Sequence, residues 1–180
     1  MSIKKDKNIN SIRENIEVDE GVLGDIAYIA DGNVRKAIFI LEMLEIRGLA
    51  TDRSAVHRLV QSTTLQAGRH LLELALRGRV VEWRWENIRG RKTKVLAGAL
   101  AEVDHLMNNH GLDSDDLIAQ LHDVLVGRRL AIPDDLREEL LSSLAECDIQ
   151  IRSTMHARIP FENFLHKAST SGRRHGLAFG

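Results

Sequence analysis

Residues 31–38 read Asp31-Gly32-Asn33-Val34-Arg35-Lys36-Ala37-Ile38, and this stretch joins two segments with helical hydrophobic periodicity. Gly32 suits the left-handed position that ends a helix, and the helical pattern after it continues to Gly48. Arg35 falls in the first turn of the second helix, where the positive end of the helix dipole makes phosphate a natural partner. An arginine at such a position is more often simply solvated. The flanking residues are therefore needed to distinguish a solvated arginine from one that binds phosphate.

The helical pattern extends in both directions from this junction. Upstream, Asp19 is placed to cap the first helix, and downstream Thr51 or Asp52 is placed to cap a short third helix. These segments predict a small helical bundle over residues 1–62.

A second helical domain is predicted over residues 63–168. Its first helix begins near Thr64 and stops at Gly78. Later helices are expected over residues 95–107, 117–126, 134–144, 145–155 and 161–167. The tail, residues 169–180, combines Gly, Ser and Arg without periodicity and is expected to be disordered. With two prolines and few aromatic or β-branched runs, the chain is assigned to the all-α class.

The composition is the one expected of a soluble globular protein, with 28% charged and 43% hydrophobic residues in 180. A net charge of −1 gives no global electrostatic reason to bind nucleic acid or a membrane. The single cysteine, Cys147, excludes an internal disulfide framework and fits a reducing compartment. No apolar run reaches membrane-spanning length and the N-terminus lacks the apolar region of a signal peptide, so a cytoplasmic location is expected.

No constellation of catalytic or metal-binding residues stands out in the sequence. The eight histidines are scattered without the spacing that a metal site needs, so no metal is expected. Cys147 has no evident base partner and is expected to be a buried structural thiol. A Gly-rich phosphate loop ending in Lys-Ser/Thr is absent, as is an acidic cluster after a hydrophobic strand to hold magnesium. The chain alone is therefore not expected to hydrolyse nucleotides.

Residues 79–94 differ from the helical segments around them. They contain Trp83, Trp85 and six basic against two acidic residues. The favoured interpretation is a solvated loop or helix extension whose indoles cover a neighbouring helix. The other interpretation is a nucleic-acid-binding surface, because basic side chains and exposed indoles suit phosphates and bases. Its candidate contacts are Arg84, Arg89, Arg91 and Lys92.

Two sets of residues resemble a known family. Ile16-Glu17-Val18-Asp19-Glu20-Gly21 followed by residues 26–38 resembles the lid domain of the replication factor C small subunit, a clamp-loader ATPase of the AAA+ class. The family writes Gly-Asp-Met-Arg-Lys/Arg-Ala-Ile-Asn at the helix junction, so Arg35 is kept while Asn33, Val34 and Phe39 depart. Residues 111–122, 132–133, 144–149 and 158–165 resemble the collar of the same family. The resemblance covers about residues 16–168, with residues 79–94 as an insertion.

This resemblance implies an AAA+ lid-like bundle of three to four helices at residues 1–62 and a helical collar-like domain at residues 63–168. Family members also carry an ATPase domain with Walker motifs, a sensor arginine and a Ser-Arg-Cys motif, and this sequence contains none of them. The chain is thus compatible with an excised piece, a truncated gene product or a degenerate paralogue. Arg35 matches the lid arginine that reaches the nucleotide of its own subunit. ATP and magnesium are expected only in the family complex, and no cofactor on the chain alone.

The collar implies a role in assembly, because five collars pack into a ring in the family. Homo- or hetero-oligomeric contacts with other clamp-loader subunits are expected, with the sliding clamp and primer–template DNA reached only indirectly and no membrane partner. The collar helices carry more apolar positions than a small bundle needs, and Phe161 and Phe164 share one helical face. The competing interpretation places both rings in the core of the chain. The expected interface residues are Leu117, Leu121, Phe161, Phe164 and Leu165.

The function expected from these features is that of the non-catalytic lid and assembly portion of a clamp-loader small subunit. Such a portion serves DNA replication when the sliding clamp is loaded at primer–template junctions. It would reside in the cytoplasm at the nucleoid, or in the nucleus of a eukaryote. The alternative is a stand-alone helical DNA-binding or regulatory protein that uses the basic segment 79–94.

Overall fold

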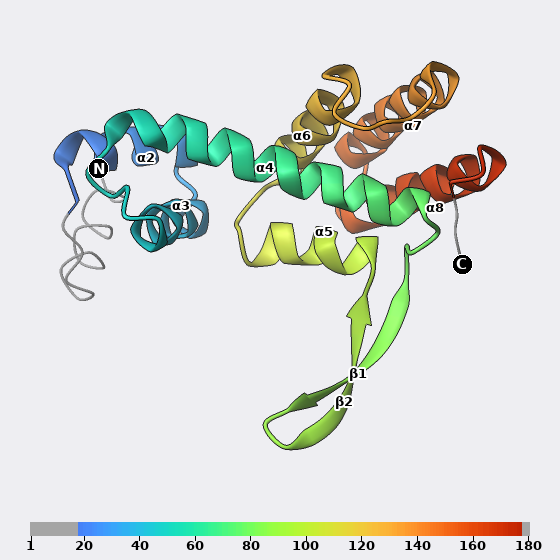
Figure 1. Cartoon of the computed structure of the whole chain (residues 1–180), viewed down its shortest axis with the longest axis horizontal. Helices are drawn as coiled ribbons and strands as arrows, with labels where there is room; N and C mark the ends of the chain where they lie inside the picture. Colours follow the sequence, from blue (N-terminus) through green and yellow to red (C-terminus); the bar gives the residue numbers. More distant parts are fainter. Residues whose placement is uncertain (1–17, 178–180) are drawn as a thin grey trace. The chain divides into compact units, whose positions relative to one another are not determined.

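The computed structural model describes residues 18–177, and these residues form seven α-helices and one β-hairpin (Figure 1). The all-α class is therefore confirmed, with a single two-stranded sheet added to it. The elements in chain order are α2 (Glu20–Ala30), α3 (Val34–Ile46), α4 (Arg53–Leu76), β1 (Glu82–Ile88), β2 (Arg91–Ala97), α5 (Ala99–Asn108), α6 (Ser114–Val126), α7 (Asp134–Arg152) and α8 (Arg158–Arg174). The first 17 residues of the expected bundle and the last three of the expected tail lie outside the described residues.

The internal contacts divide the chain into two compact units. Unit 1 holds the described residues up to Thr64 together with Asn108–Leu112, and unit 2 holds Leu65–Met107 and the residues from Asp113 onward. Helix α4 contributes residues to both units. The segment Asn108–Leu112, which the sequence assigns to the second domain, makes its contacts in unit 1 instead.

Unit 1 is organised around one apolar cluster. Asp19 caps α2 through a 2.7 Å hydrogen bond from the backbone N–H of Gly21, as its position in the sequence predicts. The apolar residues of α2 and α3 recur every three or four positions and meet those of the first turns of α4. The buried members are Val22, Ile26, Ala30, Ala37, Ile40, Leu41, Leu44, Val56 and Leu59.

Unit 2 is built mainly from α7 packed against α6 and α8, together with α5 and the C-terminal part of α4. A capping box fixes the start of α6, in which the side chains of Asp113 and Asp116 each accept from the other's backbone N–H. The largest fully buried side chains of this unit are Phe161, Phe164, Leu71, Leu72, Leu106, Leu117, Leu121, Leu125 and Leu136.

Two pairs of expected helices are continuous in the structure. Helix α4 runs unbroken through the expected boundary at residues 62–64, and α7 joins the segments 134–144 and 145–155. Neither boundary carries a Pro or an αL glycine, so the backbone has no reason to stop there.

The expected disorder from residue 169 is wrong for the described part of that tail. Helix α8 continues to Arg174 and ends in a Schellman motif, in which the N–H of Leu177 donates to the carbonyl of Gly172 at 2.8 Å. Gly172 is buried because α8 passes α4 so closely that a Cβ would lie 2.3 Å from the carbonyl oxygen of Leu76. The small residues that suggest disorder in the sequence are thus the residues that let two helices approach.

Residues 79–94 form neither a loop nor a helix extension, because β1 and β2 build an antiparallel hairpin there. Arg89 and Gly90 sit at φ 50° and 80° in the two-residue turn, a left-handed pair that matches the twist of tight hairpins. The hairpin projects from the helices of unit 2 (Figure 1). Among residues 18–177, no helix is both long and apolar enough to cross a bilayer.

Candidate functional sites

The junction between α2 and α3 presents Arg35 to solvent. Asp31 and Gly32 both take the left-handed conformation, at φ 40° and 85°, and this ends α2. Asn33 then caps α3, its side-chain oxygen accepting from the N–H of Lys36 at 3.0 Å. Arg35 is the second residue of α3 and is exposed, so its cation stands beside the positive end of the helix.

A segment distant in the sequence holds this junction in place. The side-chain amide of Asn33 donates a 2.7 Å hydrogen bond to the carbonyl of Gly111. Gly111 lies so close to the first turn of α3 that a Cβ would stand 2.5 Å from the backbone nitrogen of Lys36. Beside it, the rings of Phe39 and His110 stack with centroids 4.0 Å apart. Asn33 and Phe39, two of the departures from the family pattern, therefore both contact this segment.

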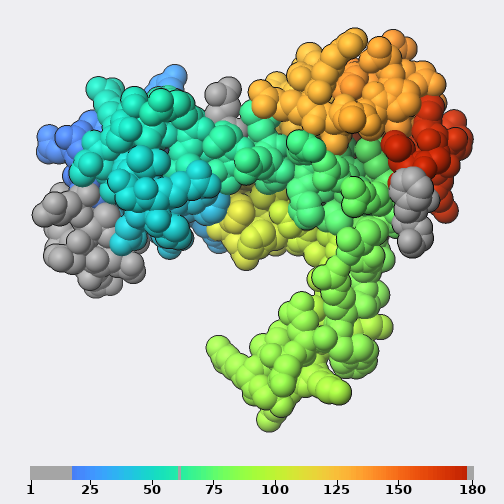
Figure 2. Space-filling view, in the orientation of Figure 1, coloured from blue at the N-terminus to red at the C-terminus, as the bar shows by residue number. Residues whose placement is uncertain are grey.

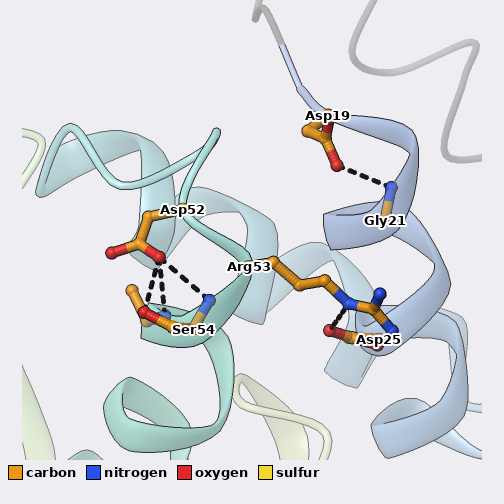
Figure 3. A network of polar contacts seen from close by, with 7 residues as sticks. Asp19, Gly21, Asp25, Asp52, Arg53 and Ser54 are labelled. Atoms are coloured by element: carbon orange, nitrogen blue, oxygen red, sulfur yellow. Dashed lines mark hydrogen bonds and ion pairs between the residues drawn. The ribbon is translucent and has the colours of Figure 1, made fainter.

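A second polar network ties α2 to the start of α4 (Figure 3). The Nε and Nη2 of Arg53 donate to the two carboxylate oxygens of Asp25 at 2.7 and 2.9 Å. Hydrogen bonding to Arg53 lowers the pKa of Asp25 below its ordinary value and raises that of Arg53. Asp52 caps α4 by accepting from the N–H and hydroxyl of Ser54, which lowers the pKa of Asp52. The Arg53–Asp25 pair therefore joins two helices, whereas the Asp52–Ser54 pair is a local cap of α4.

The expected nucleic-acid contacts all lie on the hairpin. Arg84 is on β1, Arg89 is in the turn, and Arg91 and Lys92 are on β2; all four are exposed. Figure 2 shows the hairpin, in light green, standing out from the helices of unit 2. The four cations do not form one patch, because alternate residues of a strand point to opposite faces. Arg84 and Arg91 share one face, and Lys92 belongs to the other.

The five expected interface residues are buried inside the chain. Leu117, Leu121, Phe161, Phe164 and Leu165 are each 0–1% exposed and belong to the core of unit 2. Their assignment to an interface is therefore wrong, and the competing interpretation of the two phenyl rings holds. Packing the helices of unit 2 against one another buries the apolar residues that were expected to exceed what a small bundle needs. Helical periodicity alone does not show how much apolar surface the chain buries by itself.

Exposed apolar side chains instead occur around the connection from α7 to α8. Ile149 on α7, Met155 in the connection and Ile159 at the start of α8 are 68%, 96% and 63% exposed. None of the three is among the interface residues expected from the sequence, although each is visible there as an apolar residue. Apolar residues grouped at one end of two packed helices are available for contact with another surface.

Arg137 is a buried cation that no motif in the sequence singles out. Its guanidinium donates to the carbonyls of Leu125 at 2.7 Å, Leu130 at 3.2 Å and Ile132 at 3.3 Å. These carbonyls lie at the C-terminal end of α6 and in the loop that follows. The role of Arg137 is to hold this loop against α7.

Cys147 is buried, and its burial raises the pKa of the thiol to about 12. Such a thiol carries almost no thiolate at neutral pH and does not act as a nucleophile. Across residues 18–177, no three His, Cys, Asp or Glu side chains gather as a metal ion would require.

Comparison with known proteins gives these units a context. Residues 91–167 match the family described as Replication factor C C-terminal domain, and this stretch contains β2, α5, α6, α7 and the part of α8 up to Lys167. Beyond that match, replication factor C small subunits align with nearly the whole chain. The protein of Sulfurisphaera tokodaii is 28% identical over 90% of this chain, that of Archaeoglobus fulgidus 24% over 90%, and that of Sulfolobus acidocaldarius 26% over 96%.

The chain spans about half the length of these curated relatives, covering 44%, 45% and 50% of them respectively. The comparisons give no support to the alternative of a stand-alone DNA-binding or regulatory protein. They agree with the resemblance read from the junction at Arg35 and from the C-terminal helices. The chain is thus similar to the C-terminal region of replication factor C small subunits, and its residues 91–167 match the family described as Replication factor C C-terminal domain.

Proposed function

We propose that this chain provides the lid and collar portions of a clamp-loader small subunit and is not itself catalytic. In that role it serves DNA replication, as part of an assembly that loads the sliding clamp at primer–template junctions. The single observation that carries the proposal is the alignment of 90% of the chain with replication factor C small subunits. The two compact units are consistent with a lid (unit 1) followed by a collar (unit 2).

Arg35 is the residue through which unit 1 would meet a nucleotide. Its exposure at the N-terminus of α3 leaves the guanidinium available to the phosphates of ATP bound, with magnesium, by an ATPase domain. Within the described residues the Arg35 side chain makes no hydrogen bond or ion pair that would have to be broken first. On its own the chain is expected to bind nucleotide weakly and to hydrolyse none.

Assembly is the part of this function that the chain performs by itself. We place the contact with neighbouring clamp-loader subunits at Ile149, Met155 and Ile159, because the collar positions expected from the sequence are buried. These three side chains belong to unit 2, in the region that matches the family.

Sedimentation velocity tests this proposal directly. The chain is measured at tens of micromolar, alone and mixed with a full-length replication factor C small subunit. Mixed oligomers of defined mass are expected, together with a fall in the ATPase activity of the full-length protein as this chain takes up positions in its ring. A chain that sediments as a monomer in both samples would contradict the proposal.

A further inference from the structure

The hairpin carries both tryptophans of the chain on one of its faces. In the register of β1 and β2, Trp83 lies opposite Leu96, Trp85 opposite Lys94, and Asn87 opposite Lys92. Directly opposed residues project to the same side of a ribbon, and alternate residues share that side. We call this set the tryptophan face, which consists of Trp83, Trp85, Asn87, Lys92, Lys94 and Leu96.

The two faces of the hairpin differ in charge, because the face opposite the tryptophans carries Arg84 and Arg91 together with both carboxylates. Both charged residues of the tryptophan face, Lys92 and Lys94, are basic. The two carboxylates, Glu82 and Glu86, lie on the opposite face. Glu82 accepts two hydrogen bonds from Arg79, at 2.9 and 2.8 Å, which lower its pKa and keep it ionised there. The tryptophan face is therefore purely cationic.

The indoles are presented to solvent and contribute little to the core. Trp83 is 57% exposed and Trp85 70% exposed, whereas Val80 at the base of the hairpin is 2% exposed. The Nζ of Lys94 lies over the Trp83 ring, 5.2 Å from its centre, a cation–π contact that places the ammonium against one face of the indole. Two large aromatic side chains that are exposed to water beside cations form a surface suited to binding a ligand.

We propose that the tryptophan face binds single-stranded nucleic acid, with two bases stacked on Trp83 and Trp85 and the phosphates paired with Lys92 and Lys94. Residues two apart on a strand are separated by about 6.7 Å, which leaves each indole room to take its own base. Stacking accepts any base, and lysines neutralise phosphates without reading sequence, so the binding is not sequence-specific.

A single strand fits this face better than a duplex does. A two-stranded ribbon can enter the major groove, but a duplex keeps its base faces stacked on each other and out of reach of the indoles. An acidic peptide would satisfy the lysines and leave the two aromatic planes unused. The inference does not depend on the proposed assembly function, because the hairpin face is complete within unit 2.

The test exploits the fact that the chain has only these two tryptophans. Intrinsic fluorescence of the full chain is titrated with a 20-nucleotide oligo-dT at low salt, and anisotropy of the same oligonucleotide with a dye label is followed in parallel. We expect saturable quenching and a matching anisotropy rise. Because ion release drives phosphate binding, affinity should fall with added salt, and Lys92→Gln with Lys94→Gln should reduce that salt dependence.

Variants separate stacking from charge. The double variant Trp83→Ala and Trp85→Ala should weaken binding at least tenfold, and Trp→Phe at both positions should recover part of it. Arg129→Gln removes one exposed cation of unit 2 outside the hairpin and serves as the matched control, with affinity expected within about twofold of the original. All these positions are exposed, so circular dichroism should show an unchanged fold.

Three results would overturn the inference. The first is no saturable quenching or anisotropy change up to about 100 μM protein, well above the range of weak non-specific binding. The second is a double tryptophan variant that binds oligo-dT as tightly as the original chain. The third is equal quenching by a 20-base-pair duplex or by a poly-glutamate peptide, which would assign the face to a different partner.

Discussion

Arg137 shows how much a single buried cation contributes to unit 2. Its guanidinium donates to the carbonyl of Leu125 at the end of α6 and to those of Leu130 and Ile132 in the loop that follows. Arg137→Met keeps the apolar stem but removes these three hydrogen bonds, so we expect a loss of about 2–4 kcal/mol in the free energy of unfolding. Urea denaturation measures it. Arg152→Met, on the exposed surface of the same helix, is the control and should cost no more than about 0.5 kcal/mol.

Cys147 yields a second prediction at the scale of one residue. Because burial raises the pKa of its thiol to about 12, the reactive thiolate is nearly absent at pH 8. An aromatic disulfide reagent should therefore not modify the native chain over an hour at pH 8, and should modify one thiol per chain at once in denaturant. Fast, stoichiometric modification without denaturant would show that Cys147 is accessible after all.

The tie between α2 and α4 makes the stability of unit 1 depend on pH. Arg53 holds the pKa of Asp25 below its ordinary value of 3.8 in the folded state. A carboxyl whose pKa is lowered by folding stabilises the protein above the unfolded value and loses that contribution as the pH falls through the folded value. Asp25→Asn should therefore melt below the original chain at pH 7, and the gap should close below pH 3.8. Thermal melts across this range, with Glu42→Gln as the control, check it.

The hairpin is expected to be dispensable for folding, but a deletion must keep the residues at the base of the hairpin. The carbonyls of Arg79 and Val80 accept from the N–H groups of Ala99 and Leu100 at 2.8 and 3.0 Å, so these residues belong to the helical unit. Replacing residues 83–96 by Asn-Gly keeps the base and closes a short turn. The thermal transition should stay nearly unchanged, because the removed side chains are exposed or half-buried. A loss above about 3 kcal/mol would show that the removed residues support the core.

Elements with a one-sided apolar pattern could be predicted from the sequence, and the hairpin could not. Helices α2, α3 and α6 follow their periodicity, and Asp19 caps α2 as its position in the sequence predicts. Both faces of the hairpin are exposed to water. Its strands therefore lack the alternation of apolar and polar residues that is typical of a strand with one buried face. The sequence does contain one sign of a strand, because Trp83 and Trp85 alternate with charged residues before an Arg-Gly turn. This pattern indicates a strand only if a strand with both faces exposed is considered.

A site residue could be predicted from the sequence where its position depends on local structure, and could not where it depends on tertiary packing. Arg35 could be placed from the sequence because its position depends on a local turn and cap. Whether Phe164 faces the core or a partner depends on how α8 meets the rest of unit 2. Helical periodicity identifies the apolar side of a helix but not what covers it. The contact of Asn33 with Gly111 likewise joins residues 78 positions apart, beyond any local pattern.

At the scale of the whole molecule, assembly should depend on the exposed apolar residues of unit 2. Ile149→Glu with Ile159→Glu places two charges on side chains that are 68% and 63% exposed, so the variant should fold and sediment as a monomer. Ile46→Glu makes the same change at an 83% exposed position of unit 1 and should leave assembly intact. Phe164→Glu, by contrast, buries a charge in the core, and loss of the folded state is expected. Sedimentation velocity with circular dichroism distinguishes these outcomes. A double variant that assembles as the original chain does would exclude this surface, because charge at its centre could not be tolerated in an apolar contact.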